Sequence, residues 1–398
     1  MTGATPPAAA PPAATRPGAV GGGATRAVIW VQHLLGTGHT VRAAAIAHAL
    51  AARGTEVTLV LGATPPPTLD LHGLRVARLE PVVATDATFA TIATAGGVAY
   101  RDIAASRAAA FAQVVDTVRP DILLLETFPL GRRAFAAEIL PVLEALPVPR
   151  PLVAASVRDV LVKKSAGKAA AMTDLARATL DIVLVHADPR FVTLADSFPA
   201  AAAIEDMIRY TGFVHSTAAP DDGGTDGAGE AIVSCGGGAV GRALVEAAIG
   251  AAAQGPSLQW RILVPRGLMP LLPEWRAAAP GNVLLEPNRP DFRALLGRAA
   301  ISISQAGYNT ALDVLAAGVR AIFVPFAAHD ETEQTDRARA LAARGLAAVI
   351  AERDLTASRL AGAVASAMAA PPPARPEIDL DGAARSADIL VAEAACRR

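Results

Sequence analysis

The sequence predicts an α/β protein made of two Rossmann-like domains with a cleft between them. Short apolar runs with the character of buried strands alternate with alanine-rich helical stretches, which favours parallel sheets covered by helices. With 398 residues, the chain is also longer than one typical domain. A polar, glycine-rich stretch over 215–230 interrupts the alternation, which then restarts, so we expect a linker there.

The first domain is expected over 26–214. Its predicted strands are the apolar runs at 27–32, 56–62, 121–126, 151–156 and 181–186. A loop over 33–40 separates the first strand from a predicted helix over 41–54, whose face of small residues suits packing on a sheet. Gly54 lies where a glycine commonly ends a helix, which supports that boundary.

The second domain is expected over 231–370. Its predicted strands lie at 231–235, 260–265, 282–287, 300–304 and 320–326, with a glycine loop and a helix over 242–253 after the first of them. Open α/β sheets bind ligands at the carboxyl ends of their strands, so we expect both sheets to face the cleft with those ends. In the final segment, 371–398, a helix over 382–395 is expected to pack back on the first domain.

Composition limits the functional classes. The formal net charge is -1, so there is no basic field of the kind that accompanies nucleic-acid binding. Two distant cysteines, Cys235 and Cys396, give no disulfide framework, which suits a reducing cytoplasm. Residues 1–25 are rich in Pro, Ala and Gly and are expected to be a disordered tail without the features of a signal peptide. No transmembrane span is predicted, while peripheral contact with a membrane stays open.

The stretch SQAGYNTALD, residues 304–313, places small and polar residues between a predicted strand and a predicted helix. Gly307 allows a tight turn, and Asn309 or Thr310 is expected to cap the helix. The free N–H groups of such a helix start form an anion site suited to a diphosphate. Asp313, expected on the first turn, either completes a capping box with Thr310 or accepts hydrogen bonds from a ribose diol.

A second polar loop begins at 327, after the next predicted strand, and contains Glu333 and Gln334. Acidic residues at a helix start are ordinary partners of the helix dipole, which is the simplest interpretation of Glu333. Two consecutive units of strand, polar loop and helix nevertheless gather donors and acceptors at one end of the sheet. That arrangement suits the hydroxyls of a sugar nucleotide.

The stretch SQAGYNTALDVLAAGVRAIFVPF, followed by ETEQ, resembles the donor-binding half of the family that includes the peptidoglycan lipid-intermediate N-acetylglucosaminyltransferase. That family has the two-domain glycosyltransferase-B fold. The resemblance implies that Asp313 holds the ribose hydroxyls and that Glu333 and Gln334 contact the donor sugar. It also implies a diphosphate cradle made of Ser304, Gln305, Ala306, Gly307, Asn309 and Thr310. Stretches of the first domain resemble a less characterised branch of predicted glycosyltransferases in that family.

Two glycine loops resemble those of the same family. They add Gly36 and Gly38 in the first domain, and Gly236, Gly237 and Gly238 in the second, to the expected donor-binding residues. The first loop lacks one glycine that the family has before its histidine. The second loop, with Gly241, also fits a dinucleotide-binding fingerprint, but no acid ends the next predicted strand, which disfavours a nicotinamide enzyme.

Two residues of the first domain are candidate bases. His39 is expected at a helix start, where the dipole disfavours the imidazolium form and leaves a neutral ring able to accept a proton, although a solvated or capping histidine is the ordinary alternative. Glu126 ends a buried strand and is the other candidate base. Arg132 and Arg158 are expected to bind the acceptor, while a structural ion pair involving Glu126 is an equal alternative.

The sequence therefore predicts a glycosyltransferase that moves a hexose-type sugar from a nucleoside diphosphate-sugar, such as a UDP-sugar, to an acceptor hydroxyl. The alternatives are a sugar-nucleotide epimerase or hydrolase of the same fold and a non-catalytic nucleotide-sugar-binding protein. We expect no bound metal and no cofactor beyond the nucleotide sugar as co-substrate. The acceptor, lipid-linked or soluble, stays open, as does the inverting outcome that only the resemblance implies.

Overall fold

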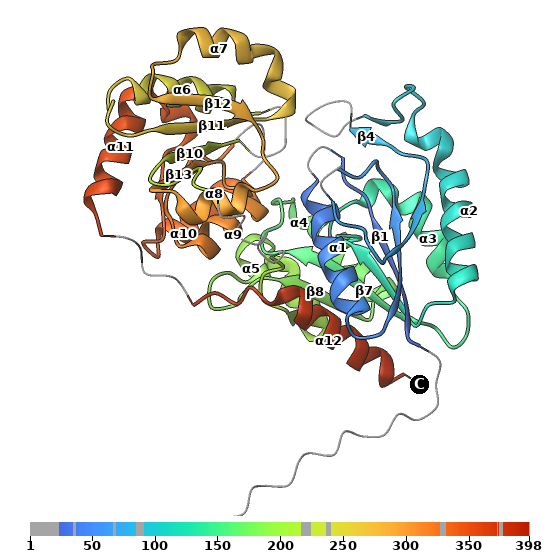
Figure 1. The fold of residues 1–398 in the computed structure, drawn as a ribbon. Coiled ribbons are helices and arrows are strands. Elements are labelled where there is room, and N and C mark those ends of the chain that lie inside the picture. The colour runs from blue at the N-terminus through green and yellow to red at the C-terminus, as the bar shows by residue number, and fades with distance from the viewer. Residues whose placement is uncertain are drawn as a thin grey trace, which may run out of the picture.

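The computed structural model describes residues 24–34, 37–66, 69–84, 91–215, 224–235, 240–326, 332–371, 373 and 377–397. Its two largest sheets belong to two α/β lobes, which Figure 1 shows next to each other, with helices on both faces of each sheet. The α/β class and the two Rossmann-like sheets predicted from the sequence are confirmed.

The first sheet has seven strands in the order β3-β2-β1-β6-β7-β8-β9, and all its paired strands are parallel. Its strands are β1 (Arg26–Val31), β2 (Glu56–Leu61), β3 (Arg75–Arg78), β6 (Ile122–Glu126), β7 (Leu152–Arg158), β8 (Ile182–His186) and β9 (Ile208–Tyr210). The accompanying helices are α1 (Gly38–Ala51), α2 (Tyr100–Val118), α3 (Ala136–Glu144), α4 (Ala166–Thr179) and α5 (Leu194–Ser197). A small antiparallel pair, β4 (Val83–Ala84) and β5 (Ile92–Ala93), lies between β3 and α2 in the sequence.

Strand burial explains the continuous apolar runs. Alternate residues of β1, such as Ile29 and Trp30, enter two different cores, one on each face of the sheet. The core on one face includes residues of α2, α3 and α4, and the core on the other includes residues of α1 and the last helix of the chain. Because both faces are covered, most positions of the central strands are apolar rather than alternating with polar residues.

The second sheet has six parallel strands in the order β12-β11-β10-β13-β14-β15. They are β10 (Ala231–Ser234), β11 (Trp260–Val264), β12 (Val283–Pro287), β13 (Ile301–Ser304), β14 (Arg320–Phe323) and β15 (Ala348–Val349). The helices are α6 (Arg242–Ala252), α7 (Leu272–Ala278), α8 (Phe292–Arg298), α9 (Tyr308–Ala317), α10 (Glu333–Ala342) and α11 (Ala357–Ala369). Short 3₁₀ helices lie at Arg133–Phe135, Pro199–Met207, Arg266–Leu271 and Glu352–Asp354.

The chain returns to the first domain near its end. The Phe213 N–H donates to the Asp379 carbonyl at 2.7 Å, and Val214 forms an antiparallel bridge with Asp381. The two segments that connect the domains therefore lie side by side. Gly212 has a positive φ of 77°, and a Cβ there would lie 2.5 Å from the Asp379 carboxyl carbon, so this crossing requires a glycine.

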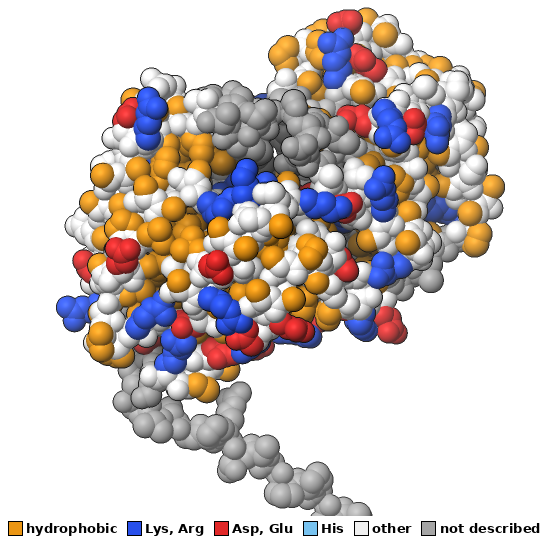
Figure 2. All heavy atoms as spheres, turned by 180° about the vertical axis from the view of Figure 1, so that it is seen from behind, with side chains coloured by type: hydrophobic (Ala, Val, Ile, Leu, Met, Phe, Trp, Pro, Cys, Tyr) orange, Lys and Arg blue, Asp and Glu red, His pale blue; other side chains and the backbone are white. Residues whose placement is uncertain are grey.

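The last helix, α12 (Gly382–Ala395), packs on α1 and the first sheet through residues such as Leu390 and Ala394. No helix among the described ranges combines the length and the apolar character that crossing a bilayer requires. Seen from behind, hydrophobic side chains gather on the first domain (Figure 2).

Candidate functional site

The two candidate bases of the first domain form a hydrogen-bonded pair. Glu126 ends β6, and His39 lies in the first turn of α1, at the same edge of the sheet. His39 Nδ1 lies 2.8 and 2.9 Å from the two carboxylate oxygens of Glu126. The Thr127 hydroxyl donates to the same carboxylate at 2.7 Å, and the Arg42 guanidinium donates to it as well. The sequence offered these residues as alternatives, whereas the structure joins them in one unit.

The surroundings of this pair determine its protonation. Burial lowers the pKa of His39 to about 4, against the opposing influence of the Glu126 charge. Burial acts to raise the pKa of Glu126, but His39 and Arg42 outweigh it and hold that pKa well below its usual range. An ionised carboxylate only accepts hydrogen bonds, so the shared proton lies on His39 Nδ1. The neutral ring then has its lone pair on Nε2, as a general base requires.

The predicted anion site begins at Gly307. This residue is the N-cap of α9, with extended backbone angles, and the helix itself starts at Tyr308. No side chain caps the helix, so the expected capping by Asn309 or Thr310 is wrong, as is the capping box between Thr310 and Asp313. The first amides of a helix have no intrahelical acceptor. A Cβ on Gly307 would meet nothing within 4 Å among the described residues, so the space beside this glycine is open.

The glycine loop of the first domain meets this helix start. A Cβ on Gly38 would lie 3.3 Å from the Asn309 side-chain amide nitrogen, so the residue next to His39 lies close to the first turn of α9. Beneath it, Ser234 and Ser304 are register partners at the ends of β10 and β13. Both hydroxyls are buried without a hydrogen-bond partner among the described residues. Two unpaired hydroxyls of the second domain therefore lie at the strand ends from which α9 follows.

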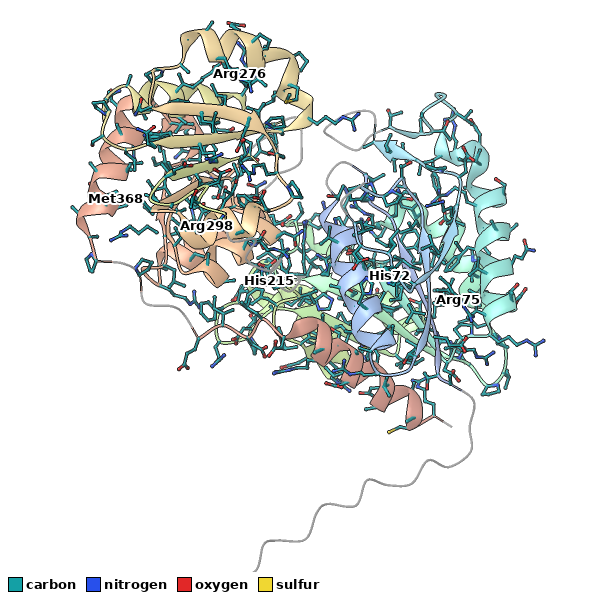
Figure 3. All side chains as sticks on the ribbon, in the orientation of Figure 1. His72, Arg75, His215, Arg276, Arg298 and Met368 are labelled. Carbon is teal, nitrogen blue, oxygen red and sulfur yellow. The ribbon has the colours of Figure 1, made fainter. Side chains whose placement is uncertain are left out.

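Asp313 lies in the second turn of α9 rather than the first, because the helix begins earlier than expected. Its Oδ1 lies 2.8 Å from His215 Nε2 and accepts from Arg293 Nε at 2.7 Å. His215 belongs to the segment that connects the two domains, and Figure 3 shows it at their junction. The acid expected to hold ribose hydroxyls is therefore buried and already paired with basic side chains from two directions.

Glu333, the first residue of α10, lies in an ion-pair network that joins the domains. It pairs with Arg158 of the first domain and accepts from Arg337 Nη2 at 2.9 Å. Arg337 in turn donates to both carboxylate oxygens of Asp159, at 2.8 and 2.6 Å. Burial opposes ionisation of Glu333, but the two arginines keep its pKa below its ordinary value. Residues predicted to bind opposite substrates, Arg158 and Glu333, thus contact each other.

The other predicted residues also have protein partners. Gln334 Oε1 accepts the Phe326 N–H at 3.1 Å, and Arg132 Nε donates to the Gln32 carbonyl at 2.9 Å. The Ala306 carbonyl accepts from Arg337 Nη1 at 2.8 Å, and the Gln305 N–H donates to the Ser234 carbonyl at 3.3 Å. Gly36, Gly236, Gly237 and Gly238 lie outside the described residues.

Several residues of the site escaped the sequence-based prediction. Arg42 and Arg337 occur in alanine-rich helical contexts where a charged residue normally faces solvent. Tyr308 offered a signal, because it is a bulky aromatic in the middle of a stretch of small residues. Within the described part of the chain, no group of three or more His, Cys, Asp or Glu residues could hold a metal ion. The expected metal independence stays a prediction.

Comparisons with known proteins point to a glycosyltransferase. The model of the glycosyltransferase family 28 C-terminal domain matches residues 287–388, which include α9, α10 and the residues Asp313, Glu333 and Arg337. The chain resembles the family 28 glycosyltransferases. The family 28 match covers the second domain from β12 onward and continues into α12, so the resemblance predicted from the 304–334 stretch is confirmed.

Part of the chain is also similar to curated proteins. The UDP-N-acetylglucosamine--N-acetylmuramyl-(pentapeptide) pyrophosphoryl-undecaprenol N-acetylglucosamine transferase of Desulforudis audaxviator (strain MP104C) is 39% identical over 90 residues. That match covers 23% of this chain and 24% of the relative, so the chain spans about a quarter of its length.

Solved structures match the whole architecture. Acinetobacter baumannii MurG has a TM-score of 0.57 at 16% identity, over 92% of this chain and 95% of that one. The glycosyltransferase VinC, in complex with DTDP, has a TM-score of 0.61 at 16% identity, over 94% and 99% of the two chains. These similarities show the glycosyltransferase-B fold.

Proposed function

We propose that the protein is a glycosyltransferase that moves a hexose-type sugar from a nucleoside diphosphate-sugar to an acceptor hydroxyl, without a bound metal. One observation carries the proposal. The His39–Glu126 pair, arranged as a general base, lies near the start of α9, because a Cβ on the neighbouring Gly38 would lie 3.3 Å from the Asn309 side chain. A base and a diphosphate site near each other are what transfer from a nucleotide sugar requires.

The diphosphate is assigned to the first turn of α9. The unpaired amides and the helix dipole there favour an anion without any cation. The ribose hydroxyls are assigned to Asp313, whose two basic partners both bind Oδ1. Oδ2 then serves the ribose. Glu333 and Gln334, at the start of α10, are assigned to the sugar hydroxyls, as the resemblance implies.

The proposed reaction follows from the protonation of the His39–Glu126 pair. Neutral His39 takes the acceptor proton on Nε2, and Glu126 stabilises the imidazolium that forms. The acceptor oxygen bonds to the anomeric carbon as the bond from that carbon to the diphosphate oxygen breaks. The negative charge that develops on the leaving diphosphate meets the amides of α9. Attack from the side opposite the diphosphate gives an inverting outcome, as in the family that the chain resembles.

The substrates are proposed from chemistry and from the relatives. The relative named above uses UDP-N-acetylglucosamine and a pyrophosphoryl-undecaprenol acceptor, according to its name. A UDP-sugar is therefore the first donor to test here, and a lipid-linked acceptor is tested beside soluble ones. Arg132 and Arg158 lie on the first-domain side of the cleft and are assigned to the acceptor. A cytoplasmic location with peripheral membrane contact agrees with such an acceptor.

The test is a turnover assay with a panel of nucleotide sugars, with and without acceptors, in the presence of a chelator. We expect transfer to a hydroxyl acceptor that persists in chelator. Suppose that donor alone gives free nucleoside diphosphate or an epimer, and that no sugar is transferred to any acceptor. The proposal would then be wrong, and the protein would be a hydrolase or an epimerase. Tight binding without turnover would make the protein a nucleotide-sugar sensor.

A further inference from the structure

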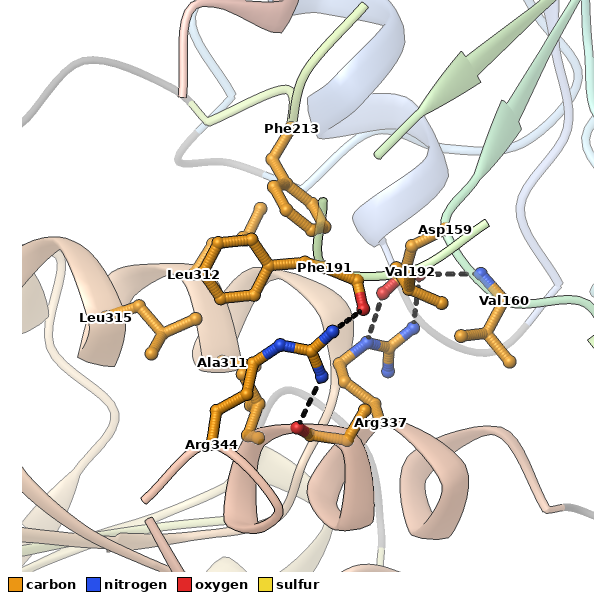
Figure 4. A pocket seen from close by; sticks show the side chains of 12 residues that line it. Asp159, Val160, Phe191, Val192, Phe213, Ala311, Leu312, Leu315, Arg337 and Arg344 are labelled. Carbon is orange, nitrogen blue, oxygen red and sulfur yellow. Dashed lines mark hydrogen bonds and ion pairs between the residues drawn. The ribbon is translucent and has the colours of Figure 1, made fainter. Parts of the chain in front are cut away.

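One buried ion pair in the described part of the chain is not used by the proposed reaction. Arg107 Nε of α2 lies 2.6 Å from Glu138 Oε2 of α3, and neither side chain has exposed surface. This pair lies inside the first domain, unlike the pair of Arg337 with Asp159, which joins the domains and borders a pocket (Figure 4). An apolar pair of similar volume often stabilises a fold as well as a buried ion pair does. Stability alone therefore does not explain the charges of Arg107 and Glu138.

The Arg107 guanidinium connects the carboxyl ends of three strands. Its Nη1 donates to the Gly62 carbonyl at 3.2 Å and to the Glu80 carbonyl, which follow β2 and β3. Its Nη2 donates to Gln32 Oε1 at 2.9 Å, directly after β1. Two further bonds go to Glu138, so all five donors of the guanidinium have acceptors. Because β3, β2 and β1 are neighbours in the sheet, one buried cation holds this part of its carboxyl edge.

The side chain of Gln32 carries this network toward the proposed base. The residue is fully buried, and its Nε2 donates to the carbonyls of His33, at 2.6 Å, and of Val82, at 3.0 Å. His33 Nδ1 in turn lies 2.7 Å from the hydroxyl oxygen of Thr40, which follows His39 in the first turn of α1. The contacts of the Gln32 amide therefore lead both to the edge of the sheet and to the helix start that presents His39.

The main chain of Gln32 reaches the other loop of the proposed site. Its carbonyl accepts from Arg132 Nε at 2.9 Å. Arg132 lies in the loop after β6, which begins with Thr127, and the Thr127 hydroxyl donates to the Glu126 carboxylate. The same loop leads into α3, which carries Glu138. The loops after β1 and β6 are thus held to one another by Gln32 and by the ion pair behind it.

The position of the Gln32 side chain is tightly restricted. A Cβ on Gly62 would overlap Gln32 Oε1 and would lie 2.9 Å from Arg107 Nη2. A glycine is therefore needed at the end of β2 for the amide to occupy this place. Since its neighbours leave it no alternative position, the amide transmits the geometry of the sheet edge to both loops.

We propose that Gln32 is a positioning residue that sets the separation between His39 and Arg132. The inference rests on the proposed function and extends it, because Arg132 is assigned to the acceptor and His39 to the acceptor proton. A displacement of about 1 Å between reacting groups can lower a rate about 100-fold. The Arg107–Glu138 pair, by fixing Gln32, therefore contributes precision at the site rather than stability.

The experiment compares substitutions of two buried side-chain amides in the full-length chain. Gln32→Met keeps the side-chain volume and removes the hydrogen bonds of the amide. The matched control is Asn282→Leu, because the Asn282 amide also donates to main-chain carbonyls, those of Ala252 and Leu258. Asn282 directly precedes β12, at the end of the second sheet opposite the proposed site.

We expect both substitutions to lower the denaturation midpoint, because each leaves buried carbonyls without donors. Only Gln32→Met should also lower kcat, about tenfold to a hundredfold, while the affinity for UDP changes less than about twofold in both variants. Unchanged kcat in Gln32→Met, or an equal loss of kcat in Asn282→Leu, would overturn the proposal. Gln32→Asn serves if Gln32→Met does not fold, since it keeps an amide on a shorter side chain. It should also lower kcat, and full kcat in Gln32→Asn would overturn the proposal.

A second readout needs no turnover. The ring signals of His39 are followed by NMR with labelled histidine and assigned through His39→Gln. We expect these signals to shift in Gln32→Met and Gln32→Asn, relative to the natural chain, and to stay in place in Asn282→Leu. Identical signals in all of these chains would overturn the positioning role, whereas absence of any transferase activity in the natural chain would overturn the proposed function alone.

Discussion

The two edges of the cleft are built differently. On the first-domain edge, His39, Glu126 and Arg42 come from one domain and already form one hydrogen-bonded unit. On the second-domain edge, the acids expected to bind the donor are occupied by basic side chains, including Arg158 and His215 from outside that domain. The difference teaches that the proposed base is held by residues of its own domain, whereas the proposed donor site is held by contacts across the domain boundary.

The largest expected effect is on the first-domain edge. His39→Gln keeps a polar side chain but removes the proton acceptor, so kcat should fall by about 10²- to 10⁴-fold. The affinity for UDP should stay within about twofold, because His39 is not assigned to the nucleotide. Steady-state kinetics and calorimetry measure the two quantities. A variant that keeps full kcat would show that the preformed pair is structural.

The network between the domains should matter most for stability. Arg337→Met leaves Asp159 buried without its bidentate partner, so the free energy of unfolding should fall by about 3–5 kcal/mol. Denaturant titration measures the change. The matched control is Lys163→Ala, whose contact with Asp336 spans 3.6 Å and is half exposed, and whose cost should be below about 1 kcal/mol. A similar loss of unfolding free energy in both variants would contradict the difference expected between the buried and the exposed ion pair.

The lowered pKa of His39 predicts a pH-dependent stability. Between its ordinary value of 6.5 and about 4, the unfolded chain binds the proton and the folded chain does not, so stability falls as pH falls through that window. Over the whole window, protonation of His39 in the unfolded chain lowers the free energy of unfolding by about 3 kcal/mol. His39→Gln should remove that part of the slope, while His72→Gln at an exposed position should not. Identical slopes for the two variants would contradict the assignment.

A smaller effect distinguishes the partners of Asp313. Asp313→Asn should weaken UDP binding about 10- to 100-fold, because hydrogen bonds from the ribose to a charged acceptor are lost. His215→Gln, which removes one internal partner of the same acid, should change the UDP affinity less than about threefold. Calorimetry on both variants measures this. If His215→Gln alone lowered the affinity for UDP, the assignment of the ribose to Asp313 would be wrong.

The sequence was informative about strands and about where polar residues follow them. The predicted strands coincide with observed ones because buried parallel strands require continuous apolar runs. The start of α9 was misplaced, because Asn309 and Thr310 are better caps by local preference than Gly307. Packing of Tyr308 in the first domain overrides that preference. The pairing of Glu126 with His39, 87 residues apart, depends on the neighbouring positions of β1 and β6, which no local pattern reveals.

The most direct test of the account is a crystal structure of the protein with UDP, obtained in chelator. The account predicts the diphosphate on the amides that follow Gly307, the ribose on Asp313, and the ring of His39 facing the diphosphate from the opposite side of the cleft. A nucleotide bound away from α9, or a diphosphate that binds only through an added divalent cation, would contradict it.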